Sequence, residues 1–178
     1  MSGSRLRRIP EAVLRLQPVR ALLRIAMAVG ATTGRAFSFL KIRALLRVPV
    51  GTVCHWSVEI KYPENLKLLG PVVIGPGCTI GAKGGVTVGA NVRVSKGVLI
   101  ETASLDVNAG LPYPHVARPI VIQDGVWLGA HSIVLGGVTI GANAVIGAGT
   151  VVSRDVSAGA IVVGSGSREI ERKSNYRT

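Results

Sequence analysis

A six-residue periodicity in the C-terminal half constrains this chain more than any other feature. From residue 122 onward, every sixth position holds an aliphatic side chain: Ile122, Leu128, Val134, Ile140, Ile146 and Val152. Four places after each comes a small or β-branched residue: Val126, Ser132, Val138, Ala144, Thr150 and Val156. This period matches neither the roughly 3.6 residues of a helical turn nor the alternation of a strand. It is typical of a β-solenoid, in which each flat face of a coil sends one large and one small side chain inward.

The same register extends upstream with interruptions. The six-residue step is present from 74 to 80 and again from 88 to 100, with a two-residue slip at 83–85 between them. The phase is lost at about 104–119, a stretch that contains residues typical of loops: Asn108, Gly110, Pro112 and Pro114. A long loop in a regular solenoid is costly to order, so we expect it to carry a function.

The first fifty residues differ in composition from the rest. They hold ten of the 21 lysines and arginines against one acidic residue, Glu11, in a chain of net charge +12. Arginines recur among leucines and alanines at helical spacing, which predicts a basic amphipathic helical segment over 1–48. The longest uncharged run, 25–34, is too short to span a bilayer. The early arginines also argue against a cleavable signal peptide.

Two interpretations of this basic segment remain open and are compatible. It is either a helical cap over the open end of the solenoid, where strand edges would otherwise be unpaired, or a peripheral contact with an anionic membrane surface. We therefore expect a cytoplasmic protein, with contact at the inner face of the membrane under the second interpretation. Charge alone would also suit nucleic acid, but no motif or interleaved aromatic residue supports that partner.

The two cysteines are too few for a disulfide framework. Cys78 falls in an inward small position four places after Ile74, which predicts buried packing. Cys54 is adjacent to His55, an arrangement that suggests a nucleophile and its base. Neighbouring residues on a strand point to opposite faces, however, so this pair is not expected to hydrogen-bond.

The motifs of the C-terminal half resemble a known family. Residues 120–130 read IVIQDGVWLGA and are similar to the P-I-x-I-G-D-x-V-W-I-G-A stretch of hexapeptide-repeat acyltransferases. The similarity continues through GGVTIG at 136–141, VIGAG at 145–149 and VVSRDV at 151–156. The sequence looks closest to sugar O-acetyltransferases of the galactoside and colanic-acid type, over about residues 50–175.

The resemblance implies a left-handed parallel β-helix, an exception to right-handed crossovers. It also implies a homotrimer that binds acetyl-CoA between neighbouring subunits and acetylates a sugar or glycan hydroxyl, in polysaccharide or glycoconjugate assembly. In this chemistry a histidine accepts the proton of the hydroxyl while its oxygen attacks the thioester carbonyl. Backbone N–H groups stabilise the oxyanion.

In this sequence the histidine expected to act as the general base is missing from its usual position. Relatives of the colanic-acid type carry it in a Gly/Ser-His-Asp triplet that opens the long loop, whereas this chain has Ser104-Leu105-Asp106 there. Some relatives have a second histidine just before the Lys/Arg-Pro-Ile that re-enters the coil, and His115 matches it. We predict that His115 is the general base and Asp106 an orienting carboxylate; the alternative for His115 is a surface residue without a role.

The remaining histidines carry weaker predictions. His131 occupies an outward position where galactoside acetyltransferases also tend to carry histidine, so it either lines the subunit groove or is an exposed coil residue. His55 precedes the regular coils and is interpreted as structural. The γ-class carbonic anhydrases share this fold, but they use a close histidine pair, which this sequence lacks. No metal site is predicted.

The resemblance also implies a set of acetyl-CoA contacts. The pantetheine arm would follow coil backbone at Trp127, Gly129, Ala130, Gly147 and Ala148. The phosphates need cations, and four basic residues near the end of the coil could supply them: Arg154, Arg168, Arg172 and Lys173. The alternative for this cluster is an ordinary solvated tail.

The sequence thus predicts a basic segment at 1–48, a β-helix at 49–164 with its loop at about 104–119, and a basic tail at 165–178. Two functional classes remain open. The first is a CoA-dependent sugar O-acetyltransferase. The second, suggested by Leu105, is a catalytically degenerate solenoid that binds CoA or scaffolds partners. Relatives of serine acetyltransferases or of γ-class carbonic anhydrases are weaker alternatives.

Overall fold

A computed structural model describes residues 48–164, the backbone of 168–170, and four single positions nearer the N-terminus (22, 33, 40 and 44). Those four positions are helical. The predicted basic segment otherwise lies outside the described residues, as does most of the basic tail. Within the described part, no helix is long and apolar enough to cross a membrane.

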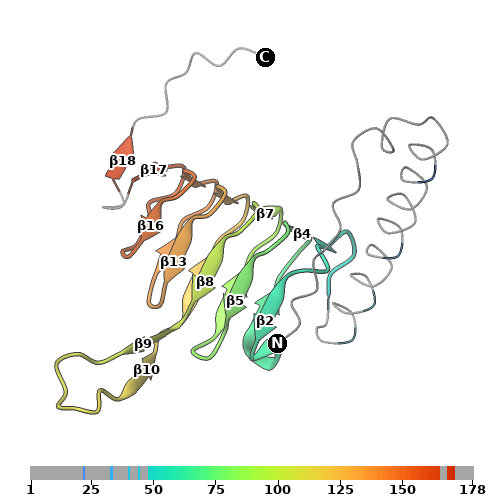
Figure 1. Cartoon of the computed structure of the whole chain (residues 1–178). Coiled ribbons are helices and arrows are strands. Elements are labelled where there is room, and N and C mark those ends of the chain that lie inside the picture. Colours follow the sequence, from blue (N-terminus) through green and yellow to red (C-terminus); the bar gives the residue numbers. More distant parts are fainter. Residues whose placement is uncertain are drawn as a thin grey trace, which may run out of the picture. The chain divides into compact units, whose positions relative to one another are not determined.

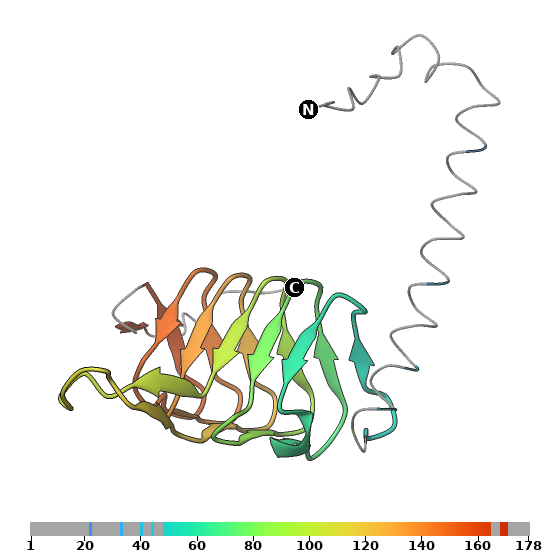
Figure 2. The ribbon, with the colours of Figure 1, turned by 60° about the horizontal axis from the view of Figure 1, so that its bottom comes forward.

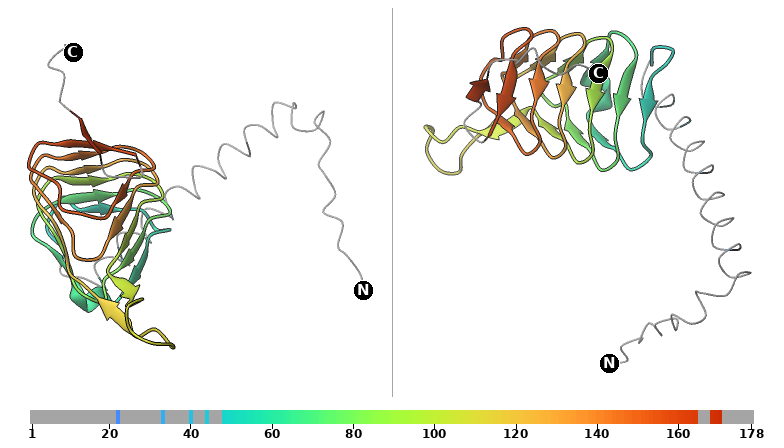
Figure 3. Two further views of the ribbon diagram at one scale, coloured as in Figure 1. Left: turned by 90° about the vertical axis from the view of Figure 1, so that its left-hand side faces the viewer. Right: turned by 90° about the horizontal axis from the view of Figure 1, so that it is seen from above.

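Short strands build three parallel faces that the chain visits in turn (Figures 1 and 3). Face A contains β1 (Val53–Cys54), β4 (Val72–Ile74), β7 (Val92–Val94), β12 (Trp127–Leu128), β15 (Val145–Ile146) and β17 (Ile161–Val163). Face B contains β2 (Glu59–Lys61), β5 (Thr79–Gly81), β8 (Leu99–Glu101), β13 (Ile133–Leu135) and β16 (Val151–Val152). Face C contains β3 (Leu66–Leu68), β6 (Val86–Val88), β11 (Ile120–Ile122) and β14 (Thr139–Ile140). The result is the left-handed parallel β-helix expected from the sequence.

The register shows how the six-residue repeat becomes a coil. Trp127 pairs with Val145, and Ile133 with Val151, so partners in the later coils are 18 residues apart, or three hexapeptides. In the first coils the partners are 20 residues apart, as at Leu66 and Val86. The extra residues lie at the corner between faces B and C, where the 3₁₀ turn η1 (Pro63–Asn65) precedes β3 and the slip at 83–85 precedes β6.

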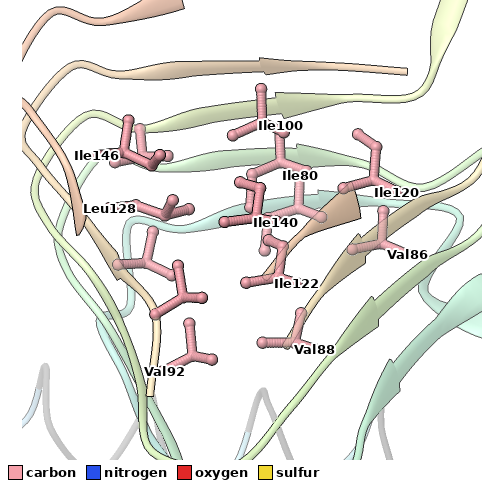
Figure 4. Close-up of a cluster of buried hydrophobic side chains, with 14 of the residues drawn as sticks. Ile80, Val86, Val88, Val92, Ile100, Ile120, Ile122, Leu128, Ile140 and Ile146 are labelled. Carbon is pink, nitrogen blue, oxygen red and sulfur yellow. The ribbon is translucent and has the colours of Figure 1, made fainter. Parts of the chain in front are cut away.

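The core is the stack of side chains that the periodicity predicted (Figure 4). All six large periodic residues from Ile122 to Val152 are at most 1% exposed, and all six small partners from Val126 to Val156 are buried. Cys78 is also buried, and its Sγ donates to the backbone oxygen of Ser95 at 3.0 Å. The predicted packing role of Cys78 is therefore confirmed.

The irregular segment between β8 and β11 is a β-hairpin that projects from the corner between faces B and C (Figures 1 and 2). Its strands are β9 (Ala103–Leu105) and β10 (His115–Ala117), which pair antiparallel. The expected loop at about 104–119 is thus partly strand. After the hairpin the coil resumes in register, since Ile120 pairs with Val86.

The last described strand, β18 (Arg168–Ile170), pairs antiparallel with β17 on face A. It follows Gly164, whose φ of 81° allows the chain to turn. Within the predicted tail at 165–178, the described residues 168–170 thus form a strand that extends face A.

Candidate functional site

The hairpin places His115 directly opposite Leu105. Directly opposed residues of an antiparallel pair point to the same side of the ribbon, with Cβ atoms roughly 5 Å apart. Both side chains are exposed, Leu105 to 45%. Within the described residues, no hydrogen bond or ion pair of the His115 imidazole is recorded. The ring is therefore available to a substrate, beside the position where the family's triplet would hold its histidine.

The structure does not pair Asp106 with this imidazole. The backbone N–H of Asp106 donates to the Pro114 oxygen at 3.0 Å, which continues the hairpin by one residue. Strand alternation then sets its side chain on the other side of the ribbon from Leu105. Its Oδ1 accepts the backbone N–H of Asn108 at 3.0 Å, so the carboxylate organises the hairpin turn. An orienting role for Asp106 stays a prediction.

The other two histidines have local structural partners. His131 sits at a corner with φ 57°, and a Cβ built on Gly97 of the preceding coil would lie 2.4 Å from its Nδ1. The ring therefore lies across the bare backbone of Gly97. His55 Nδ1 lies 2.8 Å from Ser57 Oγ and also accepts the Ser57 N–H at 3.2 Å, which supports its structural interpretation.

Cys54 is not coupled to the imidazole of His55. Its side chain is buried, and its Sγ donates to the backbone oxygen of His55 at 3.7 Å. Among the residues that the structure describes, no group of three or more potential metal ligands is close enough to hold an ion.

Small residues of two adjacent coils form the corner between faces A and B, where Ala148 and Gly149 are exposed and Gly129 is buried between the coils. A Cβ on Gly129 would lie 2.6 Å from the Ile146 oxygen and 2.7 Å from the Ala148 nitrogen, so only glycine permits this approach between coils. The Gly149 N–H donates to the Ala130 oxygen at 2.9 Å across the same pair of coils. The corner therefore presents small residues and main chain, which suits an extended ligand arm.

Trp127 lies on face A just before this corner. Its side chain is 51% exposed, and its Nε1 donates to Ser95 Oγ at 3.0 Å, which fixes the indole. The structure thus gathers the five residues predicted to contact the pantetheine arm into two adjacent coils: Trp127, Gly129, Ala130, Gly147 and Ala148.

The predicted phosphate-binding cations are described only in part. Arg154 is exposed just after β16. The backbone of Arg168 lies in β18, while its side chain, Arg172 and Lys173 lie outside the described residues. Whether these residues form one cluster stays a prediction.

A pocket of about 360 Å³ lies at the root of the hairpin. Its lining combines both hairpin strands with coil residues of face B: Thr102, Ala103, Ser104, Leu105, Asp106, Val107, Asn108, Val116, Arg118, Leu135, Gly136 and Ser153. His115 is not part of this lining. Arg118 and Ser153 were not among the site residues predicted from the sequence; the signal that the sequence offered was the position of Arg118, where the loop re-enters the coil.

The hairpin and the exposed corner lie at opposite ends of face B. Strand β13 (Ile133–Leu135) lies between the turn that ends the A–B corner and Gly136 at the B–C corner, beside the hairpin root. Three strand residues span roughly 10 Å. Within one chain, therefore, the width of face B lies between the hairpin root and the Trp127 corner.

Comparisons with known proteins agree with this architecture. The family model described as "Bacterial transferase hexapeptide (six repeats)" matches residues 119–154, and "Hexapeptide repeat of succinyl-transferase" matches residues 71–101. Two stretches of the chain thus match hexapeptide-repeat models, and its resemblance to hexapeptide-repeat acyltransferases is confirmed.

Particular relatives cover different parts of the chain. A 2,3,4,5-tetrahydropyridine-2,6-dicarboxylate N-acetyltransferase of Staphylococcus carnosus is 40% identical over 88 residues, covering 49% of this chain and 34% of the relative. The chain thus spans about a third of the length of the curated relatives it matches.

Solved structures share the fold over more of the chain. A hexapeptide-repeat-containing acetyltransferase of Vibrio cholerae, complexed with acetyl coenzyme A, superposes with a TM-score of 0.66 at 24% identity, covering 89% of this chain and 90% of the other. A galactoside acetyltransferase in complex with coenzyme A gives a TM-score of 0.58 at 30% identity, covering 64% and 58%.

Proposed function

We propose that this protein is a CoA-dependent acyltransferase that moves an acetyl group from acetyl-CoA to a sugar hydroxyl during polysaccharide or glycoconjugate assembly. The observation that carries the proposal is the exposed imidazole of His115, which projects on a hairpin from a hexapeptide β-helix and has no partner recorded in the described part of the chain. The similarity to a galactoside acetyltransferase solved with coenzyme A supports the acceptor class.

The proposed reaction is a direct transfer between two bound substrates. His115 takes the proton of the acceptor hydroxyl as the oxygen attacks the thioester carbonyl. Backbone N–H groups stabilise the resulting oxyanion. The intermediate collapses, the C–S bond breaks, and the imidazolium returns the proton to the CoA sulfur. The products are the acetyl ester and free CoA, without an acyl-enzyme.

Acetyl-CoA would lie along the corner between faces A and B. Trp127 would offer a fixed indole and the partly exposed Gly147 its main chain to the pantetheine arm, while the buried Gly129 lets the two coils approach closely. Arg154 and the basic tail would neutralise the phosphates. Two of the structural relatives hold acetyl-CoA or CoA, which supports this assignment.

The separation of the two candidate elements supports a shared site in a homotrimer. Because His115 and the A–B corner lie at opposite ends of face B, a complete site needs the hairpin of one subunit beside the corner of the next. Apolar side chains are exposed on both elements: Leu105, Val107, Leu111 and Tyr113 on the hairpin, and Trp127 at the corner. A trimer would cover them.

The test is a transfer assay with acetyl-CoA and a panel of sugar acceptors. His115→Asn should lower kcat about a hundredfold or more, the usual size for a lost general base, while acetyl-CoA affinity stays unchanged. His131→Asn is the matched control and should retain activity, because that ring lies on the Gly97 backbone. If His115→Asn transfers acetyl groups at the wild-type rate, the base assignment is wrong.

An amine acceptor is the second candidate, favoured by the names of the curated relatives, which are N-acetyltransferases. Hydroxylamine cleaves O-acetyl esters and leaves amides intact, so treatment of the labelled product separates the two reactions. A protein that binds acetyl-CoA but releases no CoA with any sugar or amine acceptor would instead be the degenerate solenoid suggested by Leu105.

For the basic N-terminal segment we propose a cytoplasmic location with contact at the anionic inner face of the membrane. The observation behind it is the excess of ten basic residues over one acidic residue in the first fifty. Such binding to anionic vesicles should weaken as salt is added. If the segment serves as a cap only, the protein will not sediment with vesicles.

A further inference from the structure

Most of the hairpin residues that line the pocket at the hairpin root have side chains on the other side of the ribbon from His115. Ser104 and Val116 are cross-strand partners that both line it, and strand alternation sets their side chains opposite to that of His115. Ala103 and Leu105, on the side of His115, complete the hairpin part of the lining, whereas His115 is absent from it. The other wall is the end of face B, at Gly136 and Ser153. The cavity is therefore separate from the proposed base, although both belong to the same hairpin.

The aliphatic part of the Arg118 side chain packs against Gly137 at this pocket. A Cβ on Gly137 would lie 3.2 Å from Arg118 Cδ and 3.5 Å from Arg118 Cβ, so the stem of the arginine lies where a side chain would otherwise stand. The backbone N–H of Arg118 also donates to the Thr102 oxygen at 3.0 Å. These contacts fix the base of the side chain and limit where its guanidinium can reach.

The charge of Arg118 is not neutralised within the described part of the chain. The ion pair found there joins Lys61 to Glu59, in the first coil. Asp106 lines the same pocket but forms no ion pair with Arg118, and its Oδ1 caps the Asn108 N–H. An exposed guanidinium on a fixed stem, without a carboxylate partner among the described residues, is suited to bind an oxyanion in a bidentate manner.

The rest of the lining suits a polyhydroxylated ligand. Ser104 and Asn108 can donate and accept hydrogen bonds, and the Asp106 carboxylate can accept from hydroxyl groups. A volume of about 360 Å³ falls in the range of small-ligand sites, about 300–1,000 Å³.

We infer that this pocket binds a monosaccharide-sized unit that carries a carboxylate or phosphate group, with Arg118 as the residue that selects the anion. Since His115 is absent from the lining of the pocket, the bound unit differs from the one that is acetylated. The acceptor is then an acidic glycan of more than one unit. Its role as acceptor rests on the proposed acetyl transfer, whereas the binding of the acidic unit does not.

Direct binding to the intact protein tests the site with three sugars that differ at one carbon: D-glucose, D-glucuronate and glucose 6-phosphate. Titration calorimetry or saturation-transfer NMR should detect one or both anionic sugars and not glucose; the anion that binds identifies the acceptor's acidic group. Arg118→Gln should weaken that binding about tenfold or more, the size expected for a lost bidentate charge-assisted pair. Arg118→Lys should retain part of it.

Lys67→Gln, which removes one charge from an exposed position on face C, is the control and should leave binding unchanged. Equal binding of glucose and glucuronate, unchanged binding by Arg118→Gln, or no binding of any sugar to the wild type would each overturn the inference. An acetyl-CoA titration of the same samples reports separately on the proposed function, because it does not depend on the pocket.

Discussion

Two buried threonines should respond in opposite directions to the same substitution. Thr102 lies at the hairpin root and is 1% exposed; its Oγ1 donates to the Gly81 oxygen at 2.6 Å and accepts the Gly84 N–H at 2.9 Å. Thr150 points into the coil with no exposure, and its Oγ1 has no hydrogen-bond partner in the described structure. We predict that Thr102→Val destabilises the protein and that Thr150→Val stabilises it.

The magnitudes follow from what each valine leaves behind. In Thr102→Val the Gly81 oxygen keeps the backbone N–H of Thr102 at 3.0 Å, but the Gly84 N–H loses its recorded acceptor. Because the Gly84 N–H is only partly buried, the loss should cost about 1 kcal/mol, the lower end of the cost of an unsatisfied donor. In Thr150→Val a hydroxyl that is desolvated without compensation becomes a methyl group, which should contribute about 1 kcal/mol of stability. Both changes keep a β-branched side chain, so the restriction on the χ1 angle is matched.

Urea unfolding measured at one protein concentration gives the two free energies of unfolding, and the fixed concentration keeps any contribution from assembly equal for the two variants. The two variants should differ by about 2 kcal/mol, the sum of the effects above. If they shift the midpoint in the same direction, or if Thr102→Val leaves it unchanged, the hydrogen-bond argument is wrong.

Two further stability predictions concern Cys78 and Gly129. Burial raises the pKa of the Cys78 thiol above its ordinary value of 9.0, so the folded state binds this proton more tightly than the unfolded chain. Its contribution to the free energy of unfolding should be full below that value and fall as pH rises past it, a slope that Cys78→Ala should lack in denaturation series at increasing pH. Gly129→Ala should cost about 1–3 kcal/mol, because the new Cβ meets main-chain atoms of the next coil that cannot rotate away. Gly110→Ala, where a Cβ meets nothing within 4 Å, should be neutral in the same assay; equal losses would contradict the prediction.

The coil could be predicted from the sequence because its physical cause is local and repeated. Each hexapeptide buries one large and one small side chain, so the burial of Ile122 and Ser132 follows from their place in the period. Even the two-residue slip at 83–85 was visible, and it corresponds to the longer coils at that end. The bare corner at Gly129 could be predicted only through the family resemblance.

The position of the hairpin along the chain could be predicted from the sequence, but its strand pairing could not. Residues 104–119 break the period, which marks an excursion without defining its pairing. The register of Leu105 with His115 depends on backbone bonds that no local pattern encodes. The placement of the Arg118 side chain depends on its contact with Gly137, 19 residues further along the chain. Whether Arg118 forms an ion pair within the described residues is likewise decided by the tertiary structure. The pocket was missed for this reason.

The position of the hairpin explains how the solenoid tolerates an irregular insertion. It leaves at a corner, so the ladders on either side are uninterrupted: Ile100 pairs with Val134 on face B, and Val86 pairs with Ile120 on face C. The gap between these faces is closed by the Arg118 N–H, which donates to the Thr102 oxygen at 3.0 Å. Because loop-closure entropy grows only slowly with loop length, a long excursion with joined ends costs little more than a short one. The hairpin sequence is therefore largely free of the packing constraint that fixes the sequence of the coil. The candidate site residues His115 and Arg118 accordingly lie in the stretch where the six-residue period is interrupted.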